Sequence, residues 1–166
     1  MNASLYSSSC QRPATSAGFT LIELMVTITV LAIIVSIAAP SISNQLANQR
    51  VKSTASTIEN ALKEAKAESI IRRQVMTMTY SNNSTASGSI TITDPSSNVI
   101  ATYQYDAKSN IKHLPVSAPS TVVFRPNKTA DERTYTICNS TMSISSRQIM
   151  VTAIATISNQ LGGTCP

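Results

Sequence analysis

The most distinctive chemical group in this sequence is a single carboxylate, Glu23, within an otherwise apolar run. The run extends from Phe19 to Pro40, and its other polar residues are hydroxyl-bearing, namely Thr20, Thr27, Thr29 and Ser36. A hydroxyl can hydrogen-bond to a carbonyl of its own helix, whereas a charged side chain at the centre of a membrane helix costs about 2.5–3.5 kcal/mol. We therefore expect Glu23 to have a partner or a function.

Two ordinary interpretations of the apolar run leave Glu23 unexplained. The run is long enough for a transmembrane helix, and it also fits a secretory signal peptide that is cut after small residues at Ser36–Ala38. The preceding segment, Met1–Gly18, is serine-rich and has one charged side chain, Arg12, which is typical of a leader.

The sequence Gly18-Phe19-Thr20-Leu21-Ile22-Glu23 resembles the prepilin signature of type IV pilins and type II secretion pseudopilins. The resemblance implies that a prepilin peptidase removes residues 1–18 by cutting between Gly18 and Phe19, and methylates the new amine. Residues 19–40 would remain as a transmembrane and filament-core helix. The protein would first reside in the bacterial inner membrane with a periplasmic domain, and later in a filament.

Glu23 lies four residues after the new amine, so its charge can neutralise that amine in an apolar environment, where unpaired charges are very costly. The resemblance implies that the amine belongs to a neighbouring subunit. The implied partners are other major and minor pilins or pseudopilins.

Pro40 ends the uninterrupted apolar run, and we expect a helix kink there, because proline removes a backbone hydrogen bond and clashes with the preceding turn. The alternative is that Pro40 only marks the exit from the membrane. Residues 41–74 form the amphipathic half of one helix over Thr20–Arg73. Its expected apolar face comprises Leu46, Val51, Ala55, Ile58, Leu62 and Ala65, and its polar face has the favourable four-residue pairs Glu59–Lys63 and Glu68–Arg72.

From Val75 onward the composition shifts to Thr, Ser, Val, Ile and Tyr in short alternating runs, which predicts β structure. The expected strands are Val75–Tyr80, Ser89–Thr93, Val99–Tyr105, Thr121–Phe124, Arg133–Cys138 and Gln148–Ser158. The fold class is therefore α+β, with a sheet that covers the apolar face of the helix.

Two further segments resemble the GspH/FimT-like group of minor pilins and pseudopilins. They are the helix end at Ala61–Val75 and the strand and turn at Val122–Lys128, although Asn127 stands where that group usually has glycine. This resemblance implies a type IV pilin-like fold, with two sheets of a globular domain at 75–166 packed on the C-terminal half of the helix.

Removal of the leader would take Cys10 with it and leave Cys138 and Cys165. In an oxidising periplasm these two cysteines are expected to form one disulfide, which would tie down the chain end. The alternative is two separate buried thiols.

Low-abundance pilins share one architecture, so the fold alone does not decide their role. The leading hypothesis is a type IV pilus minor pilin that joins a tip complex and helps to initiate assembly, and the alternative is a type II secretion minor pseudopilin. A third hypothesis is DNA binding in natural transformation. The net charge of +5, which becomes +4 without Arg12, favours it mildly. It is weakened by a C-terminal segment, 157–165, without arginine or lysine, and by cations that are scattered along the sequence: Lys108, Lys112, Arg125, Lys128, Arg133 and Arg147.

An enzyme is the weakest hypothesis, because the only histidine, His113, has no catalytic or metal-ligand pattern around it. We expect His113 in a loop or on the surface, and we expect no catalytic residue, metal or cofactor.

Overall fold

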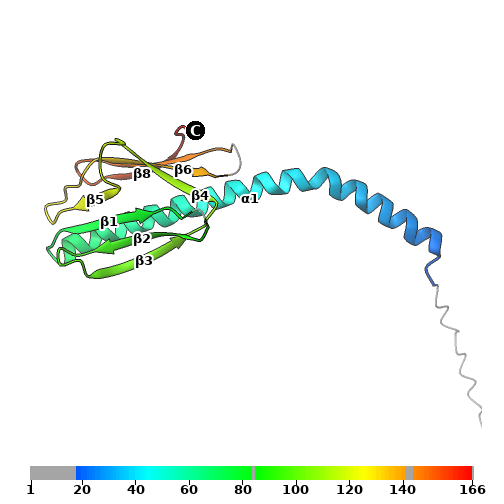
Figure 1. The fold of residues 1–166 in the computed structure, drawn as a ribbon, viewed down its shortest axis with the longest axis horizontal. Coiled ribbons are helices and arrows are strands. Elements are labelled where there is room, and N and C mark those ends of the chain that lie inside the picture. The colour runs from blue at the N-terminus through cyan, green and yellow to red at the C-terminus, as the bar shows by residue number, and fades with distance from the viewer. Residues whose placement is uncertain (1–17, 84, 141–143, 166) are drawn as a thin grey trace, which may run out of the picture. The chain divides into compact units, whose positions relative to one another are not determined.

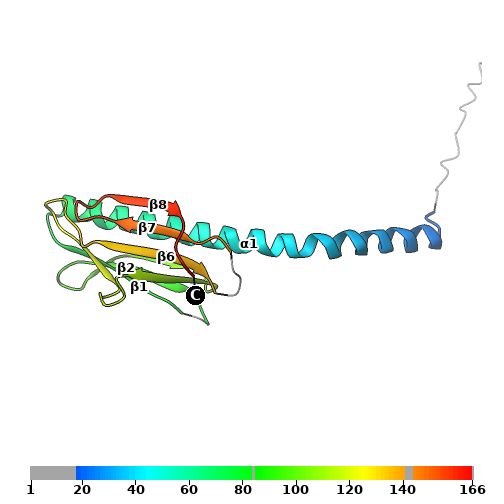
Figure 2. The same ribbon diagram turned by 90° about the horizontal axis from the view of Figure 1, so that it is seen from above.

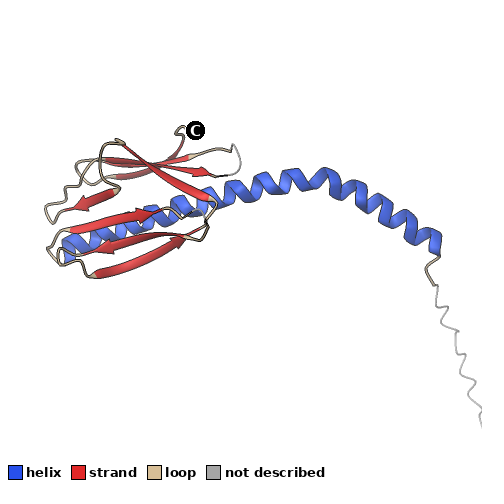
Figure 3. Ribbon diagram, in the orientation of Figure 1, coloured by secondary structure: helices blue, strands red, loops and turns tan. Residues whose placement is uncertain are grey.

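The computed structural model describes residues 18–83, 85–140 and 144–165, and only the backbone of residues 38–40. The chain divides into two compact units, Met1–Ala39 and Pro40–Pro166. The described residues form one helix, α1 (Leu21–Ile71), which passes from the first unit into the second, and eight strands in the second unit (Figure 1). The expected α+β class is confirmed (Figure 3).

The part of α1 within the second unit buries the apolar face that the spacing predicts. Val51, Ala55, Ile58, Leu62 and Ala65 are all buried in the core, whereas Leu46 is 49% exposed, so its expected burial is wrong. The neighbouring Ala47 is buried instead, because it lies four residues before Val51 on the same face, whereas Leu46 lies beside that face and lines an open groove with Gln104–Asp106. On the polar face, the expected ion pairs Glu59–Lys63 and Glu68–Arg72 are both present.

The strands form two antiparallel four-stranded sheets. Their bounds are β1 (Met76–Ser81), β2 (Gly88–Thr93), β3 (Val99–Tyr105), β4 (Ser109–Leu114), β5 (Thr121–Phe124), β6 (Arg133–Asn139), β7 (Arg147–Val151) and β8 (Ile157–Leu161). The first sheet has the order β3-β2-β1-β5 and the second has the order β4-β6-β7-β8. Alternate residues of both sheets point into one core with the helix face, among them Met78, Ile92, Phe124, Tyr135, Ile137 and Ile149. The two-sheet arrangement implied by the resemblance is therefore present.

Two strand predictions were wrong. The single strand expected at Gln148–Ser158 is two strands, β7 and β8, joined by a turn at 152–156, and strand β4 was not expected at all. The turn sequence Thr-Ala-Ile-Ala-Thr contains none of the residues that usually signal a turn. The β4 sequence, Ser-Asn-Ile-Lys-His-Leu, places polar side chains at positions where a strand usually has apolar ones.

Three hairpin turns share one backbone design. In the turns that begin at Asp94, Arg125 and Thr152, the amide of the fourth residue donates to the carbonyl of the first, and the first amide donates to the carbonyl of the fifth. The fourth residue of each turn has a positive φ: Ser97 at 65°, Lys128 at 66° and Ala155 at 54°. Glycine is the usual residue at this position, because other residues are strained there.

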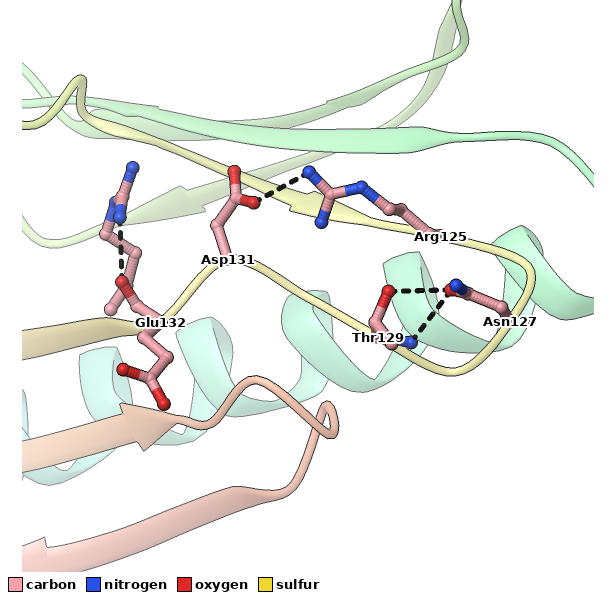
Figure 4. Close-up of polar contacts among 6 residues, drawn as sticks. Arg125, Asn127, Thr129, Asp131 and Glu132 are labelled. Carbon is pink, nitrogen blue, oxygen red and sulfur yellow. Dashed lines mark hydrogen bonds and ion pairs between the residues drawn. The ribbon is translucent and has the colours of Figure 1, made fainter.

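Figure 4 shows the second of these turns. The side chain of Asn127 accepts hydrogen bonds from the backbone N–H (3.2 Å) and the hydroxyl (2.6 Å) of Thr129, and Arg125 forms an ion pair with Asp131 at 2.9 Å. The position with glycine-like backbone conformation is therefore Lys128 and not Asn127.

Polar contacts join the helix to both sheets. Glu64 accepts a hydrogen bond from Tyr103 of β3, and Glu59 accepts one from Asn159 of β8 at 2.8 Å. Figure 2 shows β8 running along α1. Glu59 also pairs with Lys63. The hydrogen bond from Lys63, and after it that from Asn159, holds the pKa of Glu59 below its usual value. The ionised carboxylate therefore stabilises the fold above about pH 4.5, and this contribution is lost in acid, where the contact of α1 with β8 weakens as Glu59 becomes protonated.

Asn82 joins the two sheets at the end of β1. Its amide nitrogen donates to the carbonyl of Ile111 on β4 (2.8 Å), and its oxygen accepts from the N–H of Ile111 (3.0 Å) and the hydroxyl of Tyr105 (2.8 Å). Burial raises the pKa of Tyr105 to about 12, so its hydroxyl stays protonated and remains a donor at neutral pH. Asn82 thereby fills hydrogen-bonding positions on the open edge of β4.

Lys128→Gly is expected to raise the free energy of unfolding by about 1 kcal/mol, because glycine adopts a positive φ without the strain that a side chain causes. Urea denaturation of the fragment 40–166 measures this change. Pro126→Gly in the same turn is the control, and it should destabilise, because the proline preorganises the first central position of the turn. An unchanged or lowered midpoint for Lys128→Gly would show that the turn is not strained at this residue.

Candidate assembly site

The N-terminal segment begins with a capped helix. The side-chain oxygen of Thr20 accepts a hydrogen bond from the N–H of Glu23 at 3.3 Å, and the carbonyl of Thr20 accepts one from Leu24 at 3.2 Å. Thr20 is thus the N-cap residue, and Glu23 occupies the third helical position, as in a capping box. The Thr-x-x-Glu spacing was the sequence signal for this cap, and the sequence-based interpretation missed it.

The cap explains part of what Glu23 does. A carboxylate in the first turn is stabilised by the positive end of the helix dipole. This local contribution is typically 0.3–1 kcal/mol, which is smaller than the cost of an unpaired carboxylate within a membrane. A charged partner for Glu23 therefore remains a prediction, as does cleavage between the exposed residues Gly18 and Phe19.

The helix after this cap is apolar on all sides, and its large side chains from Leu21 to Ile37 are exposed. The hydroxyls of Thr27, Thr29 and Ser36 donate to carbonyls three or four residues earlier, at 2.8–3.0 Å, as expected. Among the described residues, no single helix is long and apolar enough to cross a membrane when the parts of α1 before and after residues 38–40 are taken separately. The parts 21–37 and 41–71 pass that test only as a bent pair, by length and composition.

Two expectations lie outside what the structure describes. The leader, with Cys10 and Arg12, falls within residues 1–17, and the side chain of Pro40 belongs to the undescribed set. The functional kink at Pro40 therefore stays a prediction.

The C-terminal tail is fixed at three points after β8. The N–H of Gly162 donates to the carbonyl of Ser146 at 3.1 Å, and the hydroxyl of Ser146 donates to the carbonyl of Gly163 at 2.6 Å. Cys165 then forms a disulfide with the buried Cys138 of β6, with a Cα–Cα distance of 5.8 Å. The pairing agrees with the one expected from the sequence and excludes two separate thiols.

The tail lies directly on the outer face of the second sheet. Gly163 has a φ of 97°, and a Cβ added there would lie 2.5 Å from the side chain of Thr136. Glycine is needed at this position both for the backbone conformation and for the close approach. The tail also forms one wall of an open groove of about 600 Å³, which Lys112, Leu114 and Val116 line on the other side.

The N-terminal segment also matches a known motif. Residues 14–39 match the family described as the prokaryotic N-terminal methylation motif. No curated protein shows a significant sequence match.

The solved structures that resemble the chain are minor pilins and pseudopilins. The type IV minor pilin FimU of Pseudomonas aeruginosa superimposes with a TM-score of 0.55 at 18% identity, over 70% of this chain and 90% of that one. The minor pseudopilin EpsH of the Vibrio cholerae type 2 secretion system gives a TM-score of 0.55 at 11% identity, over 69% of this chain and 99% of that one. The globular unit therefore has the fold of these two solved structures, the minor pilin FimU and the minor pseudopilin EpsH, as the resemblance implied.

The cations of the globular unit are partly engaged in contacts within the fold. Arg125 pairs with Asp131, Arg147 donates to Asn159 at 3.3 Å, and Arg133 donates to the carbonyl of Glu132 at 2.7 Å. By register, Arg147 and Arg133 lie toward opposite ends of the second sheet, because Arg147 pairs with Ile137 and Arg133 with Val151. These contacts do not add support to the DNA-binding hypothesis.

His113 is part of strand β4 and partly buried, so its expected place in a loop or on the surface is wrong. Its Nε2 lies 2.8 Å from the carbonyl of Ala118, which can only accept, so this nitrogen is the donor. Its Nδ1 is hydrogen-bonded to the hydroxyl of Tyr80 at 2.6 Å. His113 thus links β1, β4 and the loop after β4. Within the described residues, no group of three His, Cys, Asp or Glu side chains could hold a metal ion.

Cys165→Ser is expected to lower the free energy of unfolding by about 3–4 kcal/mol, because the disulfide closes a loop between residues 27 positions apart. Denaturation of the fragment 40–166 with and without reductant measures the effect. The reductant should destabilise the wild-type fragment by a similar amount and leave Cys165→Ser unchanged. Equal stability of the oxidised wild type and the variant would contradict a structural role of the disulfide.

Proposed function

We propose that this protein is a minor pilin of a type IV pilus, which joins a tip or initiation complex and helps to prime assembly. The observation that carries the proposal is the combination, in one chain, of the methylation motif at 14–39 and a globular unit with the fold of the minor pilin FimU. Before assembly, the chain is held in the inner membrane with its globular unit in the periplasm. The disulfide fits that oxidising compartment.

The mechanism of assembly depends on the pairing of two charges. Cleavage after Gly18 frees the amine of Phe19 close to a capped first turn, in which Thr20 fixes the position of Glu23. In the filament, Glu23 of one subunit neutralises the amine of a neighbouring subunit. Because either charge alone is costly in an apolar environment, the pairing favours one register of neighbouring subunits.

A type II secretion minor pseudopilin is the alternative, and the EpsH structure supports it. Its TM-score of 0.55 equals that of FimU, and the superposition includes 99% of the EpsH chain. The two roles differ in the filament that contains the protein, so cross-linking in cells from an engineered cysteine on the exposed turn at Asn127, followed by identification of the linked subunits, separates them.

The intact mass of the protein from the native membrane fraction tests processing. We expect a mass that begins at methylated Phe19, because the motif at 14–39 contains the Gly18–Phe19 bond. Reduction should add the mass of two protons, from the Cys138–Cys165 disulfide. A mass that begins after Ala38 would indicate a conventionally secreted domain and would contradict the pilin proposal.

Glu23→Ala and Glu23→Gln should both be cleaved and methylated normally, but both should enter the filament much less than wild type. Immunoblots of sheared filaments and of membranes measure the two pools. Glutamine serves the capping box as well as glutamate does, so Glu23→Gln removes the charge and retains the cap. Normal incorporation of Glu23→Gln would show that the charge is not needed, and the assembly mechanism would then be wrong.

A further inference from the structure

A polar groove lies in the second unit, close in sequence to the end of the apolar segment. It has a volume of about 600 Å³. On one side it is lined by the first turns of α1 within this unit, and on the other by the start of β7 and the end of β8; the lining residues are Ser41, Asn44, Gln45, Asn48, Gln49, Val51, Lys52, Ser145, Arg147 and Leu161.

The helix contributes a continuous stripe of hydrogen-bonding side chains to this groove. Asn44 and Gln45 lie one turn before Asn48 and Gln49, four residues away in each case, and all four are exposed. Side-chain amides donate two hydrogen bonds each, and donors of this kind suit phosphate and ester oxygens. From Ser41 to Gln49 the helix has no charged side chain.

The groove has two cationic side chains and no carboxylate among its described lining residues. Lys52 is exposed, and Arg147 is partly buried. The carboxylate linked most directly to Arg147 is that of Glu59, which contacts it through Asn159. Glu59 also pairs with Lys63 at 2.5 Å, so it offsets the charge of Arg147 only in part, and Lys52 has no carboxylate beside it among the lining residues.

The position of the groove along the chain identifies the ligand class. We propose that this groove binds the headgroup of an anionic membrane phospholipid before the protein is assembled into a filament. The inference rests on the proposed function, which places residues 19–40 in the inner membrane. Ser41 then begins the stripe at the level of the headgroups, which extend roughly 5–8 Å beyond the hydrocarbon core on each side.

The length of the stripe fits this depth. From Ser41 to Lys52 the helix extends about 17 Å, so no residue of the stripe lies farther than this from Ser41. The amides of the first turn are therefore within reach of the headgroups, and the charge of Lys52 lies within about one to two Debye lengths of them. The excess of positive charge on the chain, +5 overall, disfavours a second copy of the protein as the occupant.

The test uses the full-length chain in a neutral detergent. Native mass spectrometry would follow titrations with short-chain phosphatidylglycerol and phosphatidylcholine. We expect phosphatidylglycerol to bind at least fivefold more tightly, and Lys52→Gln to remove about fivefold of its affinity, because a cation near an anionic surface contributes about that much. Lys52 is on an exposed helix surface, so this substitution leaves the fold intact.

Lys128→Gln is the matched control, because it removes an exposed lysine from the turn before β6, next to residues that contact Ala153 beyond the end of β7, whereas the groove is lined by the start of β7. It should leave the lipid preference unchanged. Equal affinity for both lipids would overturn the proposal. An equal loss in Lys52→Gln and Lys128→Gln would reduce the effect to net charge and would also overturn it.

Inorganic phosphate separates the lipid from a free anion. We expect millimolar phosphate not to displace phosphatidylglycerol. Displacement by phosphate at the same concentration as the lipid would identify a free-anion site and contradict the proposal. Because lipid preference is measured on the purified chain, its failure is distinguishable from a failure of processing or incorporation at Phe19 and Glu23.

Discussion

The globular unit depends on one constraint: a single helical face must be covered by two sheets at once. Ala55, Ala61 and Ala65 lie on the buried side of α1 and are fully inaccessible, so the backbones of helix and strands approach closely there. Ile58 and Leu62 fill the space between the sheets, and full burial of such a side chain stabilises the fold by about 1.5–3 kcal/mol. The sheets meet over this face through Tyr80 and Tyr135, whose rings pack edge to face at 5.8 Å.

The constraint explains why some elements are evident in the sequence and others are not. The helix face and the strands β1, β2, β3, β5 and β6 bury apolar side chains with regular spacing, and their positions were predicted to within a residue or two. Strand β4 instead places Ser109 and His113 on its inward side with Ile111. His113 is tolerated there because it is bonded to Tyr80 and to the carbonyl of Ala118, and those partners come from a distant segment and a loop. A pattern of apolar residues cannot reveal a contact of this kind.

The turn between β7 and β8 was missed for a different physical reason. Where a turn has glycine, proline or asparagine, the local sequence signals it, as at Asp94-Pro95 and Pro126-Asn127. The turn between β7 and β8 has the same hydrogen bonds, but Ala155 takes the position with positive φ. Its carbonyl accepts a hydrogen bond from Lys66 of α1 at 2.8 Å, so the helix helps to hold a conformation that alanine would otherwise avoid. The turn is thus imposed by tertiary contacts.

The two ends of the chain meet different demands, and this limits what the sequence can reveal about function. The N-terminal segment combines the methylation motif, a helix cap and one charge within a short stretch, so these features can be read directly from Gly18–Glu23. The globular unit needs only a covered helix face, and many different surfaces are compatible with that requirement. FimU and EpsH illustrate this, because they share the fold with this chain at only 18% and 11% sequence identity. Its choice of partner must therefore depend on exposed groups that the core does not fix. The uncharged amides of the first helical turns and the cations Lys52 and Arg147 are such groups, because none of them contributes to the apolar core. The fold permits these groups but does not require them, and the helical ones follow the apolar segment directly in the sequence.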